Sequence, residues 1–197
     1  MINQNFIYLS LLFAIIGYGG YIIDTWKGVT QPNRVSWSLW ALAALVTLAS
    51  QHKLNGGIQL LYTAMQVILP LTIFLVSFRD KKAYWKLTRY DFLCGAVSLV
   101  GILVLLFTHR PLAALWLGIL SDFFASIPTL TKCYTNPETE SWRTYFFAVL
   151  SSLIAVLTVK PWAFVNYSFA FYVMLINVAF TLLILAPRKK QPSKQPV

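Results

Sequence analysis

Asp122 is a carboxylate in the middle of the apolar stretch "LAALWLGILSDFFASIPTL", residues 112–130. A charged side chain at the centre of a lipid bilayer costs about 3 kcal/mol or more, so it normally faces a cavity or a partner. On a helix, Ser126 lies on the same face one turn further along. We therefore expect both residues to line a solute path, with Asp122 binding the solute or coupling its movement to protons. The alternative is a neutral Asp122 that hydrogen bonds to a Ser or Tyr of a neighbouring helix.

Two amides and a serine occupy the middle of other apolar stretches. Gln66 ends the motif "LYTAMQ", Asn177 ends the similar "FYVMLIN", and Ser151 lies in "AVLSSLIAVL". An amide offers both donors and acceptors, which suits hydroxyl groups or the polar groups of an amino acid. We expect these three residues to contribute to substrate binding. For the two amides, the alternative is that they only hydrogen bond helices together.

Four prolines are candidate hinges. Pro70 and Pro128 interrupt apolar stretches, where a proline removes a backbone hydrogen bond and allows a bend. Pro32 and Pro137 lie in polar loops that lead into apolar stretches. We expect gating movements at these four positions, with static kinks as the alternative.

The remaining reactive side chains form no catalytic pattern. Cys94, Cys133, His52 and His109 lack the spacing of a metal site, and the sequence has no phosphate-binding Gly-rich loop or nucleophile elbow. We expect no enzyme activity, no metal and no cofactor.

The elements that must position these residues are membrane helices. The chain has 58% hydrophobic and only 11% charged residues, with a mean hydropathy of +0.65. A soluble domain is much more polar. The net charge of +10 comes from short basic clusters between apolar runs, which is a topology signal and does not indicate nucleic-acid binding. We expect an integral membrane protein in contact with the lipid bilayer, with no nucleic-acid partner.

Seven apolar stretches are long enough to span a bilayer, given that Trp37 and Trp142 extend the two short ones into the interface. They cover residues 6–23, 35–50, 57–78, 90–108, 112–130, 141–158 and 162–186. With seven spans, the loops on one side hold 13 of the 16 Lys and Arg residues. Because basic loops stay in the cytoplasm, we expect the N-terminus outside and the C-terminus inside.

An internal repeat divides the seven stretches. "TQPNRVSW" at residues 30–37 and "TNPETESW" at 135–142 share four residues at an offset of 105, and further identities flank them. We therefore expect two parallel three-helix bundles, 1–78 and 112–186, joined by a basic loop and linker helix at 79–111 and followed by a disordered basic tail at 187–197. The principal motif positions are Lys27, Ser36 and Trp37 in the first copy and Lys132, Ser141 and Trp142 in the second.

This arrangement resembles the PQ-loop superfamily, which includes SWEET sugar transporters, cystinosin-type amino-acid exporters and the KDEL receptor fold. The closer match is "IPTLTKCYTNPETESW", residues 127–142, although Pro128 is followed by Thr129 where the family has Gln. In SWEET-like proteins an Asn in the third helix of each unit contacts the substrate. The resemblance therefore points to Asn177, and to Gln66 by substitution. The "SWSLW" of residues 36–40 is also similar to the Trp pairs of PnuC-type vitamin transporters.

The resemblance implies a small-solute transporter that works by alternating access, carrying a sugar, an amino acid or a vitamin-like solute. The alternative is a membrane receptor or scaffold of the same fold that binds a ligand without passing it. We expect a multi-pass protein of the bacterial cytoplasmic membrane. Both a monomer and a homo-oligomer remain compatible with its length.

Overall fold

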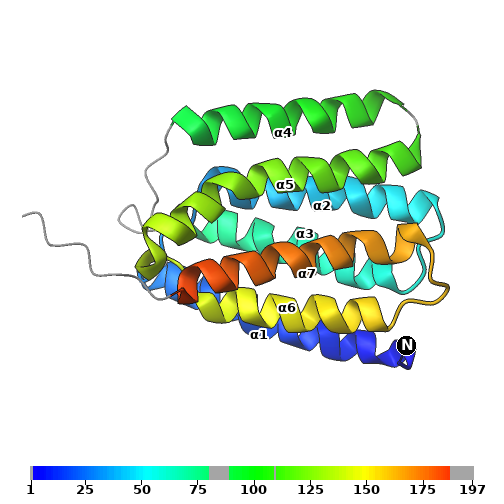
Figure 1. Ribbon diagram of the computed structural model, residues 1–197, viewed down its shortest axis with the longest axis horizontal. Helices are drawn as coiled ribbons and strands as arrows, with labels where there is room; N and C mark the ends of the chain where they lie inside the picture. The colour runs from blue at the N-terminus through cyan, green and yellow to red at the C-terminus, as the bar shows by residue number, and fades with distance from the viewer. Residues whose placement is uncertain (1, 80–88, 109, 187–197) are drawn as a thin grey trace, which may run out of the picture.

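The computed structural model describes residues 2–79, 89–108 and 110–186, and within these ranges it is helical, with no strand. The described α-helices form one elongated bundle (Figure 1). They are α1 Ile7–Trp26, α2 Arg34–Lys53, α3 Gln59–Val76, α4 Arg89–Thr108, α5 Pro111–Thr135, α6 Trp142–Leu157 and α7 Phe164–Leu185. Two 3-10 turns, η1 Gln4–Phe6 and η2 Pro137–Thr139, precede α1 and α6.

All seven apolar stretches are confirmed as helices, with differences at their ends. The largest is at α5, which was predicted to end at residue 130 and continues to Thr135. The added turn carries Lys132, whose side chain is buried in an ion pair with Glu140. A polar partner inside the protein therefore lets the helix continue past the end of the apolar run.

Four of the described helices are long and apolar enough to cross a membrane. They are α1 together with η1, then α3, α5 and α7. Helix α6 is apolar but shorter, with 16 residues. Many large apolar side chains on these helices face outward, including Ile15, Leu71 and Leu175. An apolar exterior of this kind is compatible with lipid and would be unfavourable in water.

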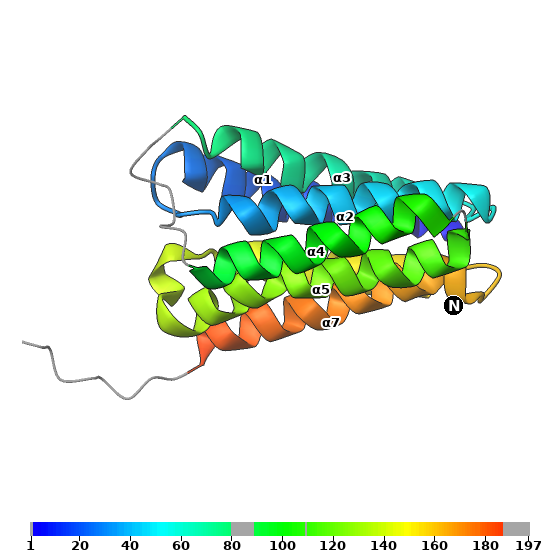
Figure 2. The same cartoon turned by 90° about the horizontal axis from the view of Figure 1, so that it is seen from above.

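The helices pack in a regular order. Helix α3 packs against α1 and α2, and α7 packs against α5 and α6. The two sets meet where α1 packs against α6 and where α2 packs against α5. Helix α4 lies outside this group against α5 and α2, as Figures 1 and 2 show.

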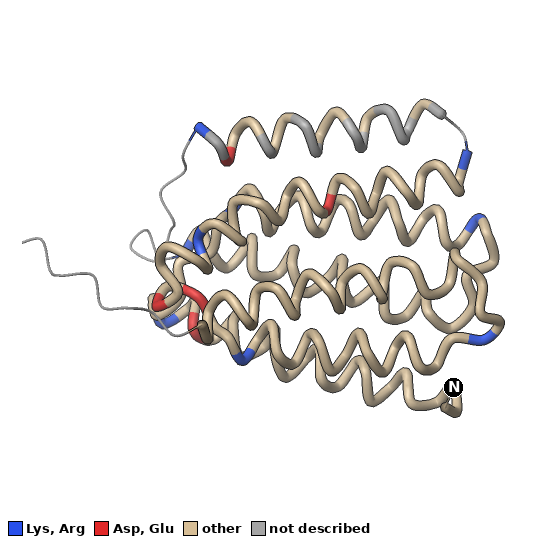
Figure 3. The backbone as a smooth tube through the Cα atoms, viewed as in Figure 1, with Lys and Arg blue, Asp and Glu red and all other residues tan. Residues whose placement is uncertain are grey.

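Most of the charged residues in the described part of the chain lie toward the two ends of the bundle (Figure 3). The loops from α1 to α2 and from α5 to α6 lie at the same end, which we call the loop end (Figure 1). The predicted tail at 187–197 and most of the basic loop before α4 lie outside the described residues. Asp122 is the one acidic residue of α5 and falls near the middle of that helix, far from the charged ends.

Candidate functional site

A cavity lies inside the bundle between the helices of the two sets. The room left for a water-sized molecule is about 30 Å³, so the cavity is narrow and would have to widen around a larger solute. Six helices contribute to its wall: Tyr18 from α1; Trp37, Trp40 and Ala44 from α2; Gln66 and Pro70 from α3; Asp122 and Ser126 from α5; Tyr145 from α6; and Phe169, Val173, Ile176, Asn177 and Phe180 from α7. Four of the predicted substrate-binding residues, Gln66, Asp122, Ser126 and Asn177, thus share one cavity.

Asp122 is the charged group of this cavity, and its side chain is only 6% exposed. Its Oδ2 accepts a hydrogen bond of 2.7 Å from the Tyr172 hydroxyl of α7. Ser126, one turn further along α5, donates to the Asp122 carbonyl at 2.9 Å and accepts from Trp40 Nε1 at 2.9 Å. The hydrogen bond to Tyr172 is of the kind expected if Asp122 only joins helices. Asp122 also lines the cavity, so the structure is compatible with both interpretations.

The two predicted amides are placed differently. Gln66 Oε1 accepts a 2.9 Å hydrogen bond from the Tyr18 hydroxyl, and Gln66 Nε2 has no partner among the described residues. A buried amide nitrogen without a partner is costly, so a polar ligand would stabilise it. Asn177 donates to the Val173 carbonyl on its own helix at 2.8 Å. Its amide nitrogen is thus already bonded, while that of Gln66 is not.

Aromatic rings follow one another around the cavity. Tyr145 lies 4.7 Å from Phe180, Phe180 lies 5.7 Å from Trp40, Trp40 lies 4.9 Å from Trp37, and Trp37 lies 6.1 Å from Tyr18, measured between ring centroids. These five residues, which we call the aromatic arc, come from α1, α2, α6 and α7. Rings at such distances support one another and keep the cavity wall rigid.

Ser151 is not part of the cavity wall. Ser10 Oγ donates to its carbonyl oxygen at 2.7 Å, and the two hydroxyls lie 3.1 Å apart, inside the contact between α1 and α6. Ser151 was predicted to bind substrate, but its contacts are those of a residue that joins two helices.

A buried ion pair links the end of α5 to the segment just before α6. Lys132 Nζ and Glu140 Oε1 are 2.5 Å apart, and both side chains are fully buried. The other carboxylate oxygen, Glu140 Oε2, accepts hydrogen bonds from Tyr21 at 3.0 Å and Tyr145 at 2.8 Å. Tyr145 also lines the cavity, so this network lies between the cavity and the loop end.

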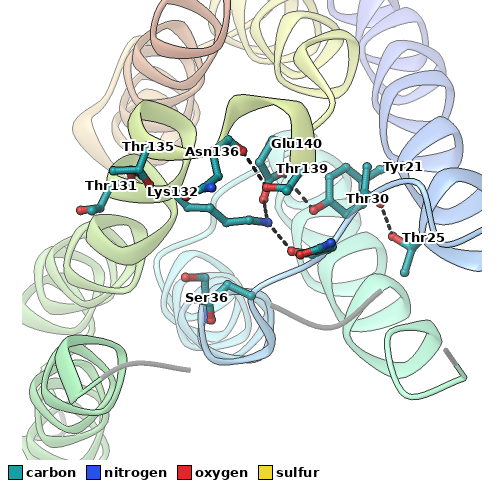
Figure 4. Close-up of polar contacts among 12 residues, drawn as sticks. Tyr21, Thr25, Thr30, Ser36, Thr131, Lys132, Thr135, Asn136, Thr139 and Glu140 are labelled. Carbon is teal, nitrogen blue, oxygen red and sulfur yellow. Dashed lines mark hydrogen bonds and ion pairs between the residues drawn. The ribbon is translucent and has the colours of Figure 1, made fainter. Parts of the chain in front are cut away.

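The two loops of the loop end bind each other directly (Figure 4). The backbone N–H of Gln31 donates to the backbone carbonyl of Thr139 at 3.1 Å. Lys132 Nζ donates to the backbone carbonyl of Gln31. Pro32 and Pro137 lie within two residues of this loop pairing. Of the helix prolines, Pro70 lines the cavity, whereas Pro128 is buried in α5.

The paired positions of the sequence repeat do not share the same surroundings. Trp37 is 1% exposed and lines the cavity, whereas Trp142 is 40% exposed. Lys132 is buried in its ion pair, whereas Lys27 is exposed. The contacts of the serines differ too: Ser36 donates to the Ala125 carbonyl at 2.7 Å, and Ser141 precedes α6 without a side-chain cap.

Sequence reasoning missed the aromatic arc and the partners of Glu140. Tyr18, Tyr145 and Phe180 look like ordinary apolar helix residues in the sequence, and Trp40 stands out only as the second Trp of "SWSLW". One signal was available: Trp40 and Tyr145 are separated by the repeat offset, since 145 − 40 = 105. Searches of protein-family models, of curated proteins and of solved structures found no match to this chain.

Proposed function

We propose that the protein is a small-solute membrane transporter that works by alternating access. The observation that carries this proposal is the cavity between the two helix sets, whose wall holds the buried carboxyl group of Asp122 and the buried amide of Gln66. Polar groups at the middle of apolar helices are costly to retain and mark solute paths in transporters.

We further propose that all seven helices cross the membrane as two parallel three-helix units joined by α4. The packing pattern supports this, because α1 contacts α6 as α5 contacts α2. Two polar contacts are also related by the repeat offset. Trp40 donates a hydrogen bond to Ser126. The repeat offset of 105 relates Trp40 to Tyr145 and Ser126 to Tyr21, and both of these tyrosines donate to Glu140. Parallel units of this kind place a substrate between them.

In this proposal the loop end faces the cytoplasm and is closed. The basic residues support the orientation, since Lys27, Arg34, Arg79, Arg89, Lys132 and Arg143 belong to the loop end and only Lys53, Arg110 and Lys160 to the opposite end. The ion pair of Lys132 with Glu140 and the loop pairing hold the cytoplasmic side shut. Opening would require both to separate, with Pro32 and Pro137 as the nearest hinges. The arrangement fits a divergent PQ-loop protein of the bacterial cytoplasmic membrane.

Flux across a sealed membrane tests the function. Purified protein is reconstituted into proteoliposomes, and uptake of labelled sugars, amino acids and vitamins is measured at a mildly acidic and a mildly alkaline pH. We expect a solute that crosses, with an uptake whose pH dependence changes in Asp122→Asn. Uptake that is unchanged in this variant would contradict the role of Asp122.

The same experiment separates transport from reception. A solute that binds the reconstituted protein but does not cross would favour a membrane receptor or scaffold. Thermal unfolding of Asp122→Asn in detergent provides the control. The variant should fold, because an amide oxygen still accepts the hydrogen bond of Tyr172.

A further inference from the structure

We infer that the solute held in this cavity is an organic cation of the quaternary ammonium or pyridinium class, bound between the Asp122 carboxylate and the aromatic arc. This inference rests on the proposed solute site and adds the chemical class of its ligand. It follows from the charge of the cavity, from the nature of its wall and from the polar group of Gln66.

The charges around the cavity favour a positive ligand. The wall contains one carboxylate, Asp122, and no Lys, Arg or His among the residues that the structure describes. The nearest cation along α5, Lys132, already pairs with Glu140. A buried carboxylate without a positive partner is unfavourable, and a cationic ligand would supply that partner. An anionic solute would meet the carboxylate with no compensating charge.

The aromatic part of the cavity wall suits a cation that has lost its hydration shell. Trp37, Trp40 and Tyr18 belong to the aromatic arc, and tryptophan is the best aromatic partner for a cation. Quaternary ammonium and pyridinium groups carry a positive charge but donate no N–H hydrogen bond. Such groups are recognised by aromatic rings and one nearby carboxylate rather than by many acceptors.

The cavity offers one further polar contact. Gln66 Nε2 and the neighbouring Tyr62 hydroxyl, both buried, make no well-formed hydrogen bond among the described residues, so the amide can donate to a hydroxyl or carbonyl oxygen on the ligand. A cation that also carries such an oxygen would use all three features of the wall. Choline is a simple molecule with this combination and serves as the first probe.

Protons should compete with the cation for Asp122. The titratable groups facing this carboxylate are Tyr172 on α7, Tyr18 on α1 and Tyr62 on α3. Tyr145 on α6 also lines the cavity, where its hydroxyl donates to Glu140. Helix α2 contributes Trp40 and Ala44 to the wall, which do not titrate. On α4 the described acid is Asp91, which accepts a hydrogen bond from Asn33 before α2. Protonation of Asp122 removes the negative charge, so cation binding should weaken as the pH falls.

The test compares ligands that differ only in charge. Thermal unfolding of the purified protein is followed with choline and with dimethylbutanol, in which carbon replaces the charged nitrogen. N-methylpyridinium and toluene form a second pair, and D-glucose and L-glutamate represent neutral and anionic solutes. We expect a cation to raise the unfolding temperature, with affinity about tenfold or more above its neutral partner.

Matched variants locate the site. Asp122→Asn should weaken cation binding about tenfold or more, because it removes the charge while an acceptor for Tyr172 remains. Asp91→Asn is the control, because it neutralises another buried carboxylate that lies outside the cavity wall. Asp91→Asn should bind the cation like the unmodified protein. Trp40→Leu should weaken the cation more than it weakens dimethylbutanol.

Each outcome decides a separate question. Stabilisation by glucose, glutamate or the neutral isosteres alone, or by no probe at all, would overturn the cation assignment. Equal cation binding by Asp122→Asn and the unmodified protein would also overturn it. Proteoliposome uptake is then measured for the cation that binds. Binding without uptake would support the cation site and contradict transport. Uptake of glucose without any cation binding would support transport and contradict the cation site.

Discussion

At the scale of single residues, Gly17 and Gly118 allow the two helix sets to pack closely against each other. A Cβ on Gly17 would lie 2.7 Å from Phe147 Cβ on α6, and a Cβ on Gly118 would lie 2.7 Å from Thr47 Oγ1 on α2. The Thr144 hydroxyl also donates to the Gly17 carbonyl at 3.1 Å. The small residues therefore bring α1 to α6 and α5 to α2, the two contacts that bound the cavity.

Gly17→Ala should destabilise the protein, because the added methyl group pushes α1 away from α6. We expect a loss of about 1 to 3 kcal/mol in the free energy of unfolding. Gly19→Ala is the matched control, since nothing lies within 4 Å of a Cβ there and alanine favours a helix. Detergent unfolding of both variants checks this, and equal stability of the two would show that the α1 to α6 contact is not tight.

Residue types and depth along the apolar stretches were enough to predict part of the site. Gln66, Asp122, Ser126 and Asn177 are polar groups whose cost in an apolar stretch is visible in the sequence. Ser151 has the same appearance but bonds to Ser10, because a small hydroxyl can satisfy itself at a helix contact. Whether a polar residue lines the cavity or lies at a helix contact depends on how its helix is rotated about its own axis. That rotation is set by packing against the other helices.

At the element scale, the ion pair of Lys132 with Glu140 links the end of α5 to the residue before α6. Glu140→Gln leaves a buried lysine without its counter-charge, so we expect a loss of about 3 to 5 kcal/mol in the free energy of unfolding. Lys132→Met should also destabilise. The double variant removes both charges and should lose clearly less than the sum of the two single losses. Strictly additive losses would show that the pair contributes no mutual stabilisation.

A disulfide between the two loops should lock the loop end. Gln31 and Thr139 are joined by a backbone hydrogen bond of 3.1 Å. Two cysteines can form a disulfide when their Cα atoms are roughly 4.4 to 6.8 Å apart, and backbones joined by a hydrogen bond are close enough for this. We expect Gln31→Cys with Thr139→Cys, in a background with Cys94→Ser and Cys133→Ser, to lose uptake on oxidation and recover it on reduction.

The single variants Gln31→Cys and Thr139→Cys provide the controls for this cross-link. Neither should respond to the oxidant, because neither can form the loop disulfide. Full uptake by the oxidised double variant, with the disulfide verified, would contradict a gate that must open at the loop end.

The helices were predictable as elements because length and apolarity alone define them. Their ends were less so, as the extension of α5 to Thr135 illustrates. That extension depends on Glu140, a residue in the next loop, and a contact between two elements leaves little trace in either stretch by itself. The same reason explains why "TNPETESW" looked like an isolated polar loop although Glu140 is buried.

At the scale of the whole molecule, the paired contacts of α1 with α6 and α5 with α2 surround the cavity, and the buried ion pair lies at the loop end. The 105-residue repeat indicated two similar units but not their surroundings, as the buried Trp37 and the exposed Trp142 demonstrate. Sequence identity at matched positions reports a shared backbone pattern, whereas burial depends on what packs against it.

The most direct measurement of alternating access is the reactivity of a thiol placed in the cavity. Ser126→Cys changes the side chain little in size and puts the thiol beside Asp122, in a background with Cys94→Ser and Cys133→Ser. A membrane-impermeant thiol reagent is added from one side of oriented vesicles, and from the other side in a second sample. Ser10→Cys, buried between α1 and α6, serves as the control that should not react.

We predict that the Ser126→Cys thiol reacts from either side, because the cavity opens to each side in turn. The disulfide between positions 31 and 139 should abolish reaction from the side that the loop end faces and preserve it from the other. A thiol that reacts from only one side without the disulfide, or from neither, would contradict alternating access.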